Sequence, residues 1–286
     1  MTKTIPTWTS RYLTYLKLGQ ESPTCDYLKR ILTQHLSLVP FENISKLVRM
    51  HRSPDFTPAI IHPAEFVKQM EMEDLGGTCF TANYSLYHLL SELGYICKLI
   101  MLGTSHLGIL VKLVEIGDEW LFLDCGSCAP FFKPIRFLDG VQEQVQFGHE
   151  IIYLEPIKAS GMYHYRRVNK GKSSDNDWIF HIDQQLTDRE IEAEIIRSYQ
   201  PDKHFMQVLK CFLFQPEQGR SLSLSNNQFK IRTHTGDEEV YILKQIADIR
   251  AVVEQEFKLP RLPLEEAILV LEQRGIDIFA DDQSTS

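Results

Sequence analysis

The sequence has 286 residues, of which 43% are hydrophobic and 24% charged, a composition typical of a globular protein with a sizeable core. The formal net charge of −8 at pH 7 argues against a nucleic-acid-binding protein, because such proteins need a basic surface. Residues 1–13 lack the apolar run of a signal peptide, and no run reaches the roughly 18 apolar residues of a membrane span. We therefore expect a cytoplasmic protein whose partners include neither nucleic acid nor a membrane.

The first third of the chain is predicted to be helical. After Ser22-Pro23-Thr24, side chains suited to one buried helix face recur at a spacing of three and four residues, at Tyr27, Leu28, Ile31, Leu32 and His35. Pro40 ends this helix. A short helix begins at residue 62, and another follows residue 79 and ends at Gly94, a residue typical of helix ends.

From residue 95 the pattern changes to short runs rich in aliphatic and aromatic side chains, which predict strands. The first three runs are 95–102, 106–114 and 119–125, with Gly117-Asp118 as a hairpin turn between the last two. Further strands are predicted at 149–156, 162–168, 177–183, 210–215 and 227–233. Helices are predicted after Thr187 and over 243–256 and 263–274. Helices first and strands later favour an α+β fold.

Cys79 is the cysteine whose sequence context most suggests chemistry. The chain has six cysteines, few for its length, and without an export signal we expect them to be reduced thiols. Cys79 follows Gly76, Gly77 and Thr78 and opens a predicted helix, where exposed N–H groups favour an anion and can hold an oxyanion. A small buried residue at a tight turn is the alternative interpretation, because free cysteine is often buried.

A nucleophilic cysteine needs a base and a group that orients the base. His106 begins the predicted strand 106–114, and Asp124 lies at the end of 119–125, which suggests a Cys-His-Asp arrangement. A two-residue turn at Gly117-Asp118 would place Asp124 opposite Val111, about 17 Å along the strand from His106. The triad therefore requires a wider turn, a bulge or another pairing.

With these residues, the chain resembles the arylamine N-acetyltransferase family. The family signature Arg-Gly-Gly-Xaa-Cys-Phe-Glu-Xaa-Asn corresponds to residues 75–83, and the family's HxxxPFEN corresponds to 35–43 with one residue more. The family's His-led strand and Asp-Val-Gly-Phe-Gly correspond to 106–108 and 124–128. The order of the four motifs agrees with the family from residue 11 to about residue 275.

The resemblance implies a fold of three parts and a ping-pong reaction. The parts are a helical bundle carrying the nucleophile (1–95), an antiparallel β-barrel carrying the histidine and aspartate (96–200) and an α/β lid (201–286), with a triad arranged as in cysteine proteases. Cys79 would take the acetyl group of the co-substrate acetyl-CoA, with His106 as base oriented by Asp124. A small aromatic amine, hydroxylamine or hydrazine would then accept it. The resemblance further assigns acceptor binding to Phe41, Gly126, Ser127 and Cys128, and coenzyme A binding to Gly103 and Thr104.

The chain departs from the family pattern near the nucleophile. The signature Arg and Glu are Leu75 and Thr81, and the usual Phe and the Gly that follows it are Ser127 and Cys128. Because replacing both members of a buried charged pair can be neutral, we interpret the joint loss of Arg and Glu as a replaced network. A catalytically idle relative that binds coenzyme A or an aromatic ligand is one alternative function. An amide synthase or hydrolase with the same triad is another.

Two other groups of residues have open interpretations. Cys125 and Cys128 have the spacing of a metal site or a redox dithiol, but there is no second C-x-x-C, and we expect no metal. The basic cluster of Arg166, Arg167, Lys170 and Lys172 either contacts the phosphates of coenzyme A or is a solvated loop, the more common case.

Overall fold

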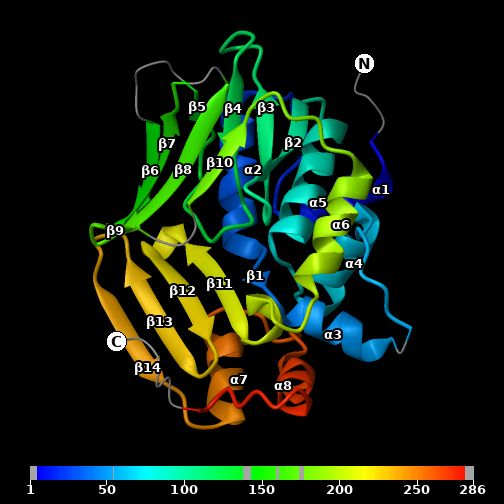
Figure 1. Cartoon of the computed structure of the whole chain (residues 1–286), viewed down its shortest axis with the longest axis vertical. Coiled ribbons are helices and arrows are strands. Elements are labelled where there is room, and N and C mark those ends of the chain that lie inside the picture. The colour runs from blue at the N-terminus through cyan, green and yellow to red at the C-terminus, as the bar shows by residue number, and fades with distance from the viewer. Residues whose placement is uncertain (1–4, 54, 138–142, 159–160, 174–176, 281–286) are drawn as a thin grey trace.

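The computed structural model describes residues 5–53, 55–137, 143–158, 161–173 and 177–280. In Figure 1 helices α1, α2, α4 and α5 lie beside two upper sheets, while a third sheet and helices α7 and α8 make up the lower part. None of the helices in these ranges is both long and apolar enough to cross a membrane.

The helices predicted after Thr24, at residue 62 and after residue 79 form where their sequence patterns predict them, and two further helices lie in the first 95 residues. Thr24 caps α2, because its side chain accepts a hydrogen bond from the Tyr27 N–H at 3.2 Å. The α2 residues predicted to share one face are all buried. Gly94 follows α5 with φ +92°, a conformation that favours glycine. The helices are α1 (Thr7–Tyr15), α2 (Cys25–Leu38), α3 (Ile44–Arg52), α4 (Pro63–Glu73) and α5 (Cys79–Glu92).

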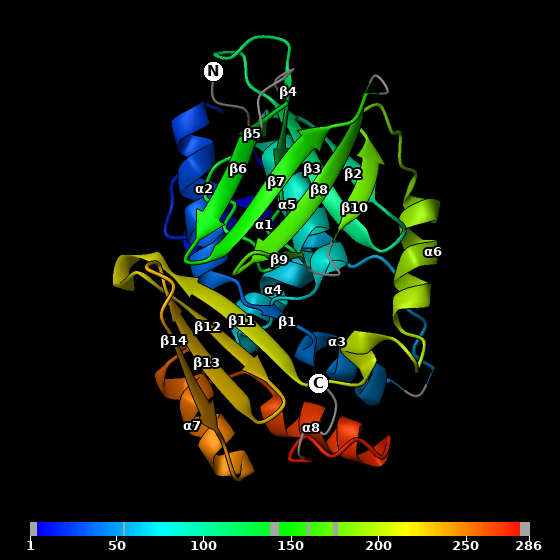
Figure 2. The ribbon, with the colours of Figure 1, turned by 60° about the vertical axis from the view of Figure 1, so that its left-hand side comes forward.

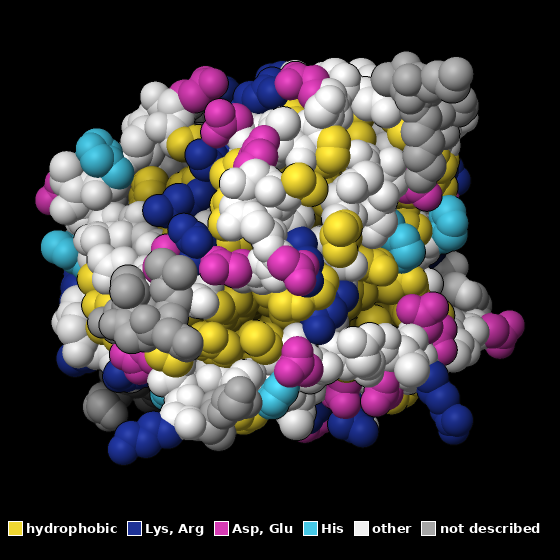
Figure 3. All heavy atoms as spheres, turned by 90° about the horizontal axis from the view of Figure 1, so that it is seen from above, with side chains coloured by type: hydrophobic (Ala, Val, Ile, Leu, Met, Phe, Trp, Pro, Cys, Tyr) yellow, Lys and Arg dark blue, Asp and Glu magenta, His cyan; other side chains and the backbone are white. Residues whose placement is uncertain are grey.

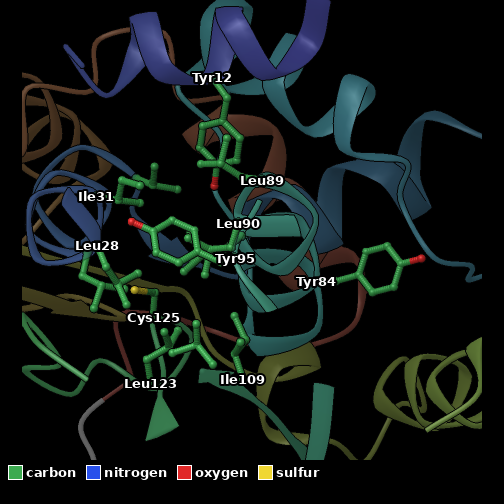
Figure 4. Close-up of a cluster of buried hydrophobic side chains, with 14 of the residues drawn as sticks. Tyr12, Leu28, Ile31, Tyr84, Leu89, Leu90, Tyr95, Ile109, Leu123 and Cys125 are labelled. Atoms are coloured by element: carbon green, nitrogen blue, oxygen red, sulfur yellow. The ribbon is translucent and has the colours of Figure 1, made fainter. Parts of the chain in front are cut away.

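These helices share a hydrophobic core with the inner face of the first upper sheet. Figure 4 shows Tyr12, Leu28 and Ile31 from the helices in one cluster with Ile109 and Leu123 from the strands. All five side chains are fully buried. The core therefore fixes the helix that begins at Cys79 against the strands that carry His106 and Asp124.

Two antiparallel upper sheets lie face to face. The first has the order β2 (Ile96–Leu102), β3 (His106–Lys112), β4 (Trp120–Leu123), β5 (Ile135–Arg136). The second has the order β10 (Trp178–His181), β8 (Met162–Asn169), β7 (Glu150–Pro156), β6 (Glu143–Phe147), and β9 (Lys172–Ser173) pairs with β8. Aromatic side chains, among them Phe122, Tyr165 and Phe180, fill the space between the sheets.

The prediction of a β-barrel over 96–200 is wrong in this detail, because the described strands form separate sheets and not one continuous closed ladder. β10 and β2 lie next to each other but do not form a strand ladder. They are joined by one backbone hydrogen bond, from the Gly103 N–H to the Ile179 carbonyl (3.3 Å), and by the side chain of Gln184. The amide of Gln184 accepts from the Met101 N–H and donates to the Met101 carbonyl, both at 3.0 Å. A glutamine thus occupies the place where a strand would have closed the barrel.

The third sheet contains strands from both ends of the chain. Its order is β1 (Phe41–Glu42), β11 (Lys210–Gln215), β12 (Arg220–Ser225), β13 (Gln228–Thr233), β14 (Glu238–Ile242), all antiparallel. Figure 2 shows this sheet below the second upper sheet, with α7 (Ile246–Gln255) and α8 (Leu264–Gln273) beneath it. Helix α6 (Asp188–Ser198) and the short helices η1 (His204–Met206) and η2 (Pro216–Gln218) complete the fold. Thr187 caps α6, as the sequence predicts.

The face of the molecule seen from above carries both acidic and basic side chains. In Figure 3 acidic and basic side chains lie interspersed there, with hydrophobic side chains between them. Such a mixed surface agrees with the moderate net charge of −8.

Candidate active site

The turn before Cys79 is held by the residues of the PFEN motif. Phe41 forms a β-bridge with Gly77, and the Glu42 N–H donates to the Gly77 carbonyl at 3.2 Å. The backbone of Gly76 lies so close to Pro40 that a Cβ there would be 1.9 Å from the Pro40 carbonyl oxygen. Only glycine fits at this position, and this contact sets where α5 begins.

Glu42 shows how the chain compensates for the signature Arg it lacks. The carboxylate is fully buried, and it accepts hydrogen bonds from the N–H groups of Gly76 (3.0 Å) and Ser45 (2.7 Å). Burial raises the pKa of Glu42, while these bonds and the charge of Arg49 oppose the rise. Leu75, in the position of the signature Arg, packs in the hydrophobic core of the lower part. Backbone amides and Arg49 thus do for Glu42 what a buried ion pair would otherwise do.

His106 and Asp124 are joined by a buried hydrogen bond. The Nε2 of His106 lies 2.8 Å from the Oδ2 of Asp124, and both side chains are almost inaccessible to solvent. Burial would raise the pKa of Asp124, but His106 and hydrogen bonds from neighbouring groups hold it below its usual value. Burial would lower the pKa of His106, but Asp124 and Cys79 raise it well above its ordinary value. The pair therefore favours imidazolium beside carboxylate.

A wide connection between β3 and β4 brings these two residues together. The structure pairs Ile109 with Leu123, so that Asp124 follows in register with Gly108 and lies on the same face as His106. The predicted two-residue turn is wrong, because residues 113–119 all lie outside the strands and form a longer connection. The register shifts by three residues from the predicted one, and this shift moves Asp124 from the opposite face to the face of His106.

Asn83 is a site residue to which the sequence analysis assigned no role. It lies one helical turn after Cys79, and its amide donates to Asp124 Oδ1 (2.7 Å) and to the Leu107 carbonyl (2.5 Å). Its Oδ1 accepts from the Cys125 N–H at 2.9 Å. The Gly126 N–H donates to the same carboxylate oxygen of Asp124 at 2.7 Å. Asn83 thus ties helix α5 to Asp124, and its place in the family signature was the signal available for it.

Trp178 is a second site residue that no sequence motif marks. Its indole stacks on the imidazole of His106, with ring centroids 4.5 Å apart and 4° between the planes. Gly103 lies against this indole, and a Cβ on it would be 2.9 Å from the Cδ1 of Trp178. Gly103 was predicted to bind coenzyme A. In the structure its lack of a side chain makes room for the indole of Trp178.

Cys79 opens onto a cavity of about 740 Å³. The cavity joins Cys79 and His106 to most of the predicted binding residues, which are Phe41, Thr104, Gly126, Ser127 and Cys128. Asp124 and Gly103 are not among the residues that line it; Asp124 is fully buried and reaches the site through His106. Gly126 lies against Cys79, since a Cβ there would be 2.5 Å from the Cys79 Cα.

The two cysteines of the C-x-x-C pair have different surroundings. Figure 4 shows the Cys125 sulfur pointing into the hydrophobic cluster beside Leu28, whereas Cys128 lines the cavity. Both are free thiols, and burial raises the pKa of Cys128 to about 12. Within the described ranges no three His, Cys, Asp or Glu side chains are placed to hold a metal ion. Cys125 is thus a core residue here.

The predicted basic cluster divides in the structure. Arg167 reaches into the cavity wall, where it donates to the carbonyls of Ser127 (2.7 Å) and Cys128 (3.3 Å). Arg166 lies 3.5 Å from Glu155, and Lys170 lies 3.0 Å from Glu238. Arg167 therefore supports the segment that follows Asp124, while the other side chains of the cluster do not line the cavity.

Lys46 fixes the end of α6 at the cavity. Its ammonium donates to the carbonyl (2.6 Å) and the hydroxyl (2.7 Å) of Ser198 and lies 4.3 Å from the centre of the Tyr199 ring. Burial lowers the pKa of Lys46 to about 8. Since Ser198 and the neighbouring Arg197 line the cavity, this contact positions one of its walls.

A sequence comparison matches residues 24–265 to a family model described as N-acetyltransferase. These 242 residues include every residue assigned above to the candidate site. A comparison with curated protein sequences gives no match.

Solved structures with the same fold agree with that match. The arylamine N-acetyltransferase from Salmonella typhimurium superposes with a TM-score of 0.75 at 18% identity, over 94% of this chain and 100% of that one. The Mycobacterium marinum arylamine N-acetyltransferase in complex with CoA has a TM-score of 0.75 at 16% identity, over 93% and 98% of the two chains. Arylamine N-acetyltransferase C from Bacillus anthracis gives 0.70 at 14% identity, over 90% and 100%. At these identities the likeness establishes a shared α+β fold.

Proposed function

The chain belongs to the arylamine N-acetyltransferase family, whose members are acyltransferases, and from this premise we propose that it moves an acetyl group from acetyl-CoA to a small amine by way of Cys79. The observation that carries the proposal is the position of Cys79. The thiol lies at a helix N-terminus, on a cavity that it shares with His106, whose imidazole is bonded to a buried carboxylate.

The first half of the reaction acylates Cys79. The proton of the Cys79 thiol resides on His106, whose charged form Asp124 favours, and the thiolate attacks the carbonyl carbon of acetyl-CoA. The developing oxyanion lies within reach of the first N–H groups of α5, which have no partner inside the helix. The C–S bond to coenzyme A then breaks, and His106 returns the proton to the departing thiolate. The thiol of coenzyme A leaves, and acetyl-Cys79 remains.

The second half transfers the acetyl group to the acceptor. The amine attacks the carbonyl carbon of acetyl-Cys79 and gives up a proton to His106, while the Cys79 thiolate leaves. Asp124 holds the imidazole in place and stabilises its charged form in both halves. The products are an amide and an enzyme ready for another acetyl-CoA. This alternation of donor and acceptor at one site is a ping-pong mechanism.

Acetyl-CoA and an aromatic amine, hydroxylamine or hydrazine are the proposed substrates. The Mycobacterium marinum relative is described in complex with CoA, and Thr104 and Ser105 line this cavity beside His106. Phe41 and Phe212 supply aromatic surface in the same cavity for an aromatic acceptor. Ser127, which replaces the usual Phe, removes an aromatic ring from the acceptor side, and Cys128 places a thiol where the family has Gly. Both changes favour acceptors other than the simplest arylamines.

The intact mass of the protein after incubation with acetyl-CoA tests the proposal. We expect one acetyl addition in the wild type and none in Cys79→Ala. Cys128→Ser is the matched control, because it removes the other thiol that lines the cavity and should still acquire the acetyl group. An acetylated Cys79→Ala protein would contradict the assignment. So would a wild-type protein that stays unacetylated while iodoacetamide readily alkylates Cys79.

A further inference from the structure

We propose that the third sheet carries an anion-binding subsite in the wall of the cavity, formed by Lys210 and Lys230 with Ser223 between them, which binds a carboxylate or phosphate group of the cavity's ligand. We call these three residues the basic wall. The inference rests on the proposed function, since the ligand is taken to be the acyl donor or the amine acceptor.

The alternation of side chains along the strands places the basic wall on one face of the sheet. Phe212, Ser223 and Lys230 are paired directly across β11, β12 and β13, and all three line the cavity. Lys210 is two residues before Phe212 and therefore lies on the same face. The opposite face carries side chains such as Leu222 and Leu224, which are fully buried in the core formed with α7 and α8.

The cavity holds more positive than negative side chains, in a chain whose net charge is −8. Its lining includes Arg167, Arg197, Lys203, Lys210, Lys230 and Arg232, but only two carboxylates, Glu150 and Glu194.

Both carboxylates are already paired. Glu150 pairs with Arg167 at 2.8 Å and with Arg232 at 3.2 Å, and Glu194 pairs with Arg197 at 2.5 Å. Arg232 also forms an ion pair with Glu238. Over the described part of the chain, neither lysine of the basic wall has a carboxylate within ion-pair distance. Lys203 pairs with Asp202 at 3.4 Å, and the charge of Lys230 helps to lower the pKa of Glu238 without forming an ion pair. Among the described residues, the two ammonium groups of the basic wall are therefore the positive charges at the cavity that have no ion pair.

Lys210 is the more constrained of the two lysines. Its ammonium has one hydrogen-bond partner, the hydroxyl of Ser223 at 3.3 Å, although it can donate three bonds. Burial, together with the charges of Lys230 and Arg167, lowers its pKa, while Cys128 acts in the opposite direction. Because a buried charge without a partner is costly, an anion bound between the lysines would remove both the repulsion and the unmet donors.

The basic wall lies at a distance from Cys79 that suits one ligand reaching both. Gly77, two residues before the nucleophile, is bridged to Phe41, which pairs with Phe212, which pairs with Ser223. Three steps between neighbouring strands amount to about 14 Å. An acceptor with a carboxylate, or the phosphates of coenzyme A, could therefore occupy the subsite while the reacting atoms lie at the thiol.

Binding calorimetry on non-reacting ligands tests the subsite without turnover. The probes form two matched pairs. Coenzyme A is compared with pantetheine, which lacks phosphates, and 4-aminobenzoate with the neutral 4-aminobenzamide. The variants are Lys210→Met and Lys230→Met, alone and together, because methionine keeps the length of the side chain and removes the charge. Lys68→Met is the control, since Lys68 lies exposed on α4 and does not line the cavity.

We expect the double variant to bind one of the anionic probes at least tenfold more weakly and its neutral partner unchanged. Loss confined to coenzyme A assigns the subsite to the donor's phosphates, and loss confined to 4-aminobenzoate assigns it to a carboxylate on the acceptor. We also expect unchanged or higher thermal stability in Lys210→Met, since no ion pair is lost. Wild-type protein that binds neither anion more tightly than its neutral partner overturns the proposal, as does a double variant whose affinities stay within twofold.

The two proposals fail separately. If no acetyl-Cys79 forms but the charge-dependent binding persists, the proposed function is wrong and the subsite stands. If Cys79 is acetylated and the double variant binds every probe like the wild type, the function stands and the subsite is wrong.

Discussion

The imidazole of His106 and the indole of Trp178 lie in parallel planes, 4.5 Å apart between ring centroids. One side of the histidine is therefore covered by an aromatic ring, and the bond to Asp124 fixes the ring's rotation. Two separate contacts, one from β10 and one from the residue after β4, thus set the orientation of the proposed base.

Replacing Trp178 should slow the acetylation of Cys79 without abolishing it. In Trp178→Ala the imidazole can tilt away from the thiol, and a misplacement of this kind costs roughly 10- to 100-fold in rate. Trp178→Phe keeps an aromatic face and should restore most of the rate. The measurement is the rate of acetyl-enzyme formation across pH, followed by mass. A merely structural tryptophan would give Ala and Phe variants that differ in melting temperature but share the wild-type rate.

Asn83→Ala should lower both stability and acetylation. The change leaves the Cys125 N–H and the Leu107 carbonyl without their partner and removes one bond from Asp124. Buried groups left unpaired cost about 1–3 kcal/mol each, so we expect the free energy of unfolding in urea to fall by about 2–4 kcal/mol. Thr14→Ala, which removes an exposed hydroxyl from α1, should change it by less than about 0.5 kcal/mol. Equal stability of Asn83→Ala and wild type would contradict the role given to Asn83.

His35 should make the protein less stable in mild acid. It is buried, neither of its ring nitrogens has a hydrogen-bond partner among the residues that the structure describes, and burial lowers its pKa to about 3. The folded state therefore binds this proton less readily than the unfolded state, and stability is lost as pH falls below about 6.5. Between pH 7 and pH 5 the loss from this one group is about 2 kcal/mol.

The His35→Leu variant provides the measurement. Its free energy of unfolding should fall less than that of the wild type between pH 7 and pH 5, by about 2 kcal/mol. Denaturant titrations at the two pH values give this difference directly. Parallel curves for the two proteins would show that His35 does not titrate on unfolding as the structure implies.

Gly76→Ala should disrupt the turn that carries the nucleophile. The added Cβ would overlap the Pro40 carbonyl oxygen, which belongs to backbone and cannot rotate away. We expect a loss of at least about 3 kcal/mol of stability, or an altered turn whose Cys79 no longer accepts acetyl. Gly19→Ala is the matched control, because within the described ranges no atom beyond its two chain neighbours lies within 4 Å of the position of its Cβ. Normal stability and acetylation of Gly76→Ala would refute the close packing of this turn.

Local patterns predicted helices α2, α4 and α5 of the bundle and most strands, because burial of one face leaves a period in the sequence. The strand β12 was missed although Leu222 and Leu224 alternate with serines, a pattern of period two that was present to be read. The pairing of β3 with β4 could not be obtained in this way. It depends on how residues 113–119 pack, and local turn residues such as Gly117 suggested a shorter connection.

The candidate site likewise contains residues that sequence motifs mark and residues that only the packing of the fold places there. Cys79, His106 and Asp124 were predicted from residue type and motif order; in the structure Cys79 and His106 line one cavity, and His106 is bonded to Asp124. Trp178 and the basic wall come from strands far along the chain, with no motif to mark them. Their relation to the site follows from sheet register and from the packing of separate sheets, which no single stretch of sequence contains.

The two-residue strand β1 has a consequence for the order in which the protein can form. Phe41 and Glu42 hold the Gly76–Gly77 turn, yet they are themselves paired with Phe212 and Cys211 of β11. During synthesis on the ribosome, the helices of the first 95 residues emerge well before β11 exists. The turn around Cys79 therefore gains its final support only after residue 212 has left the exit tunnel. A nascent chain stalled earlier would contain the Cys79 thiol without the β1–β11 pairing that supports its turn.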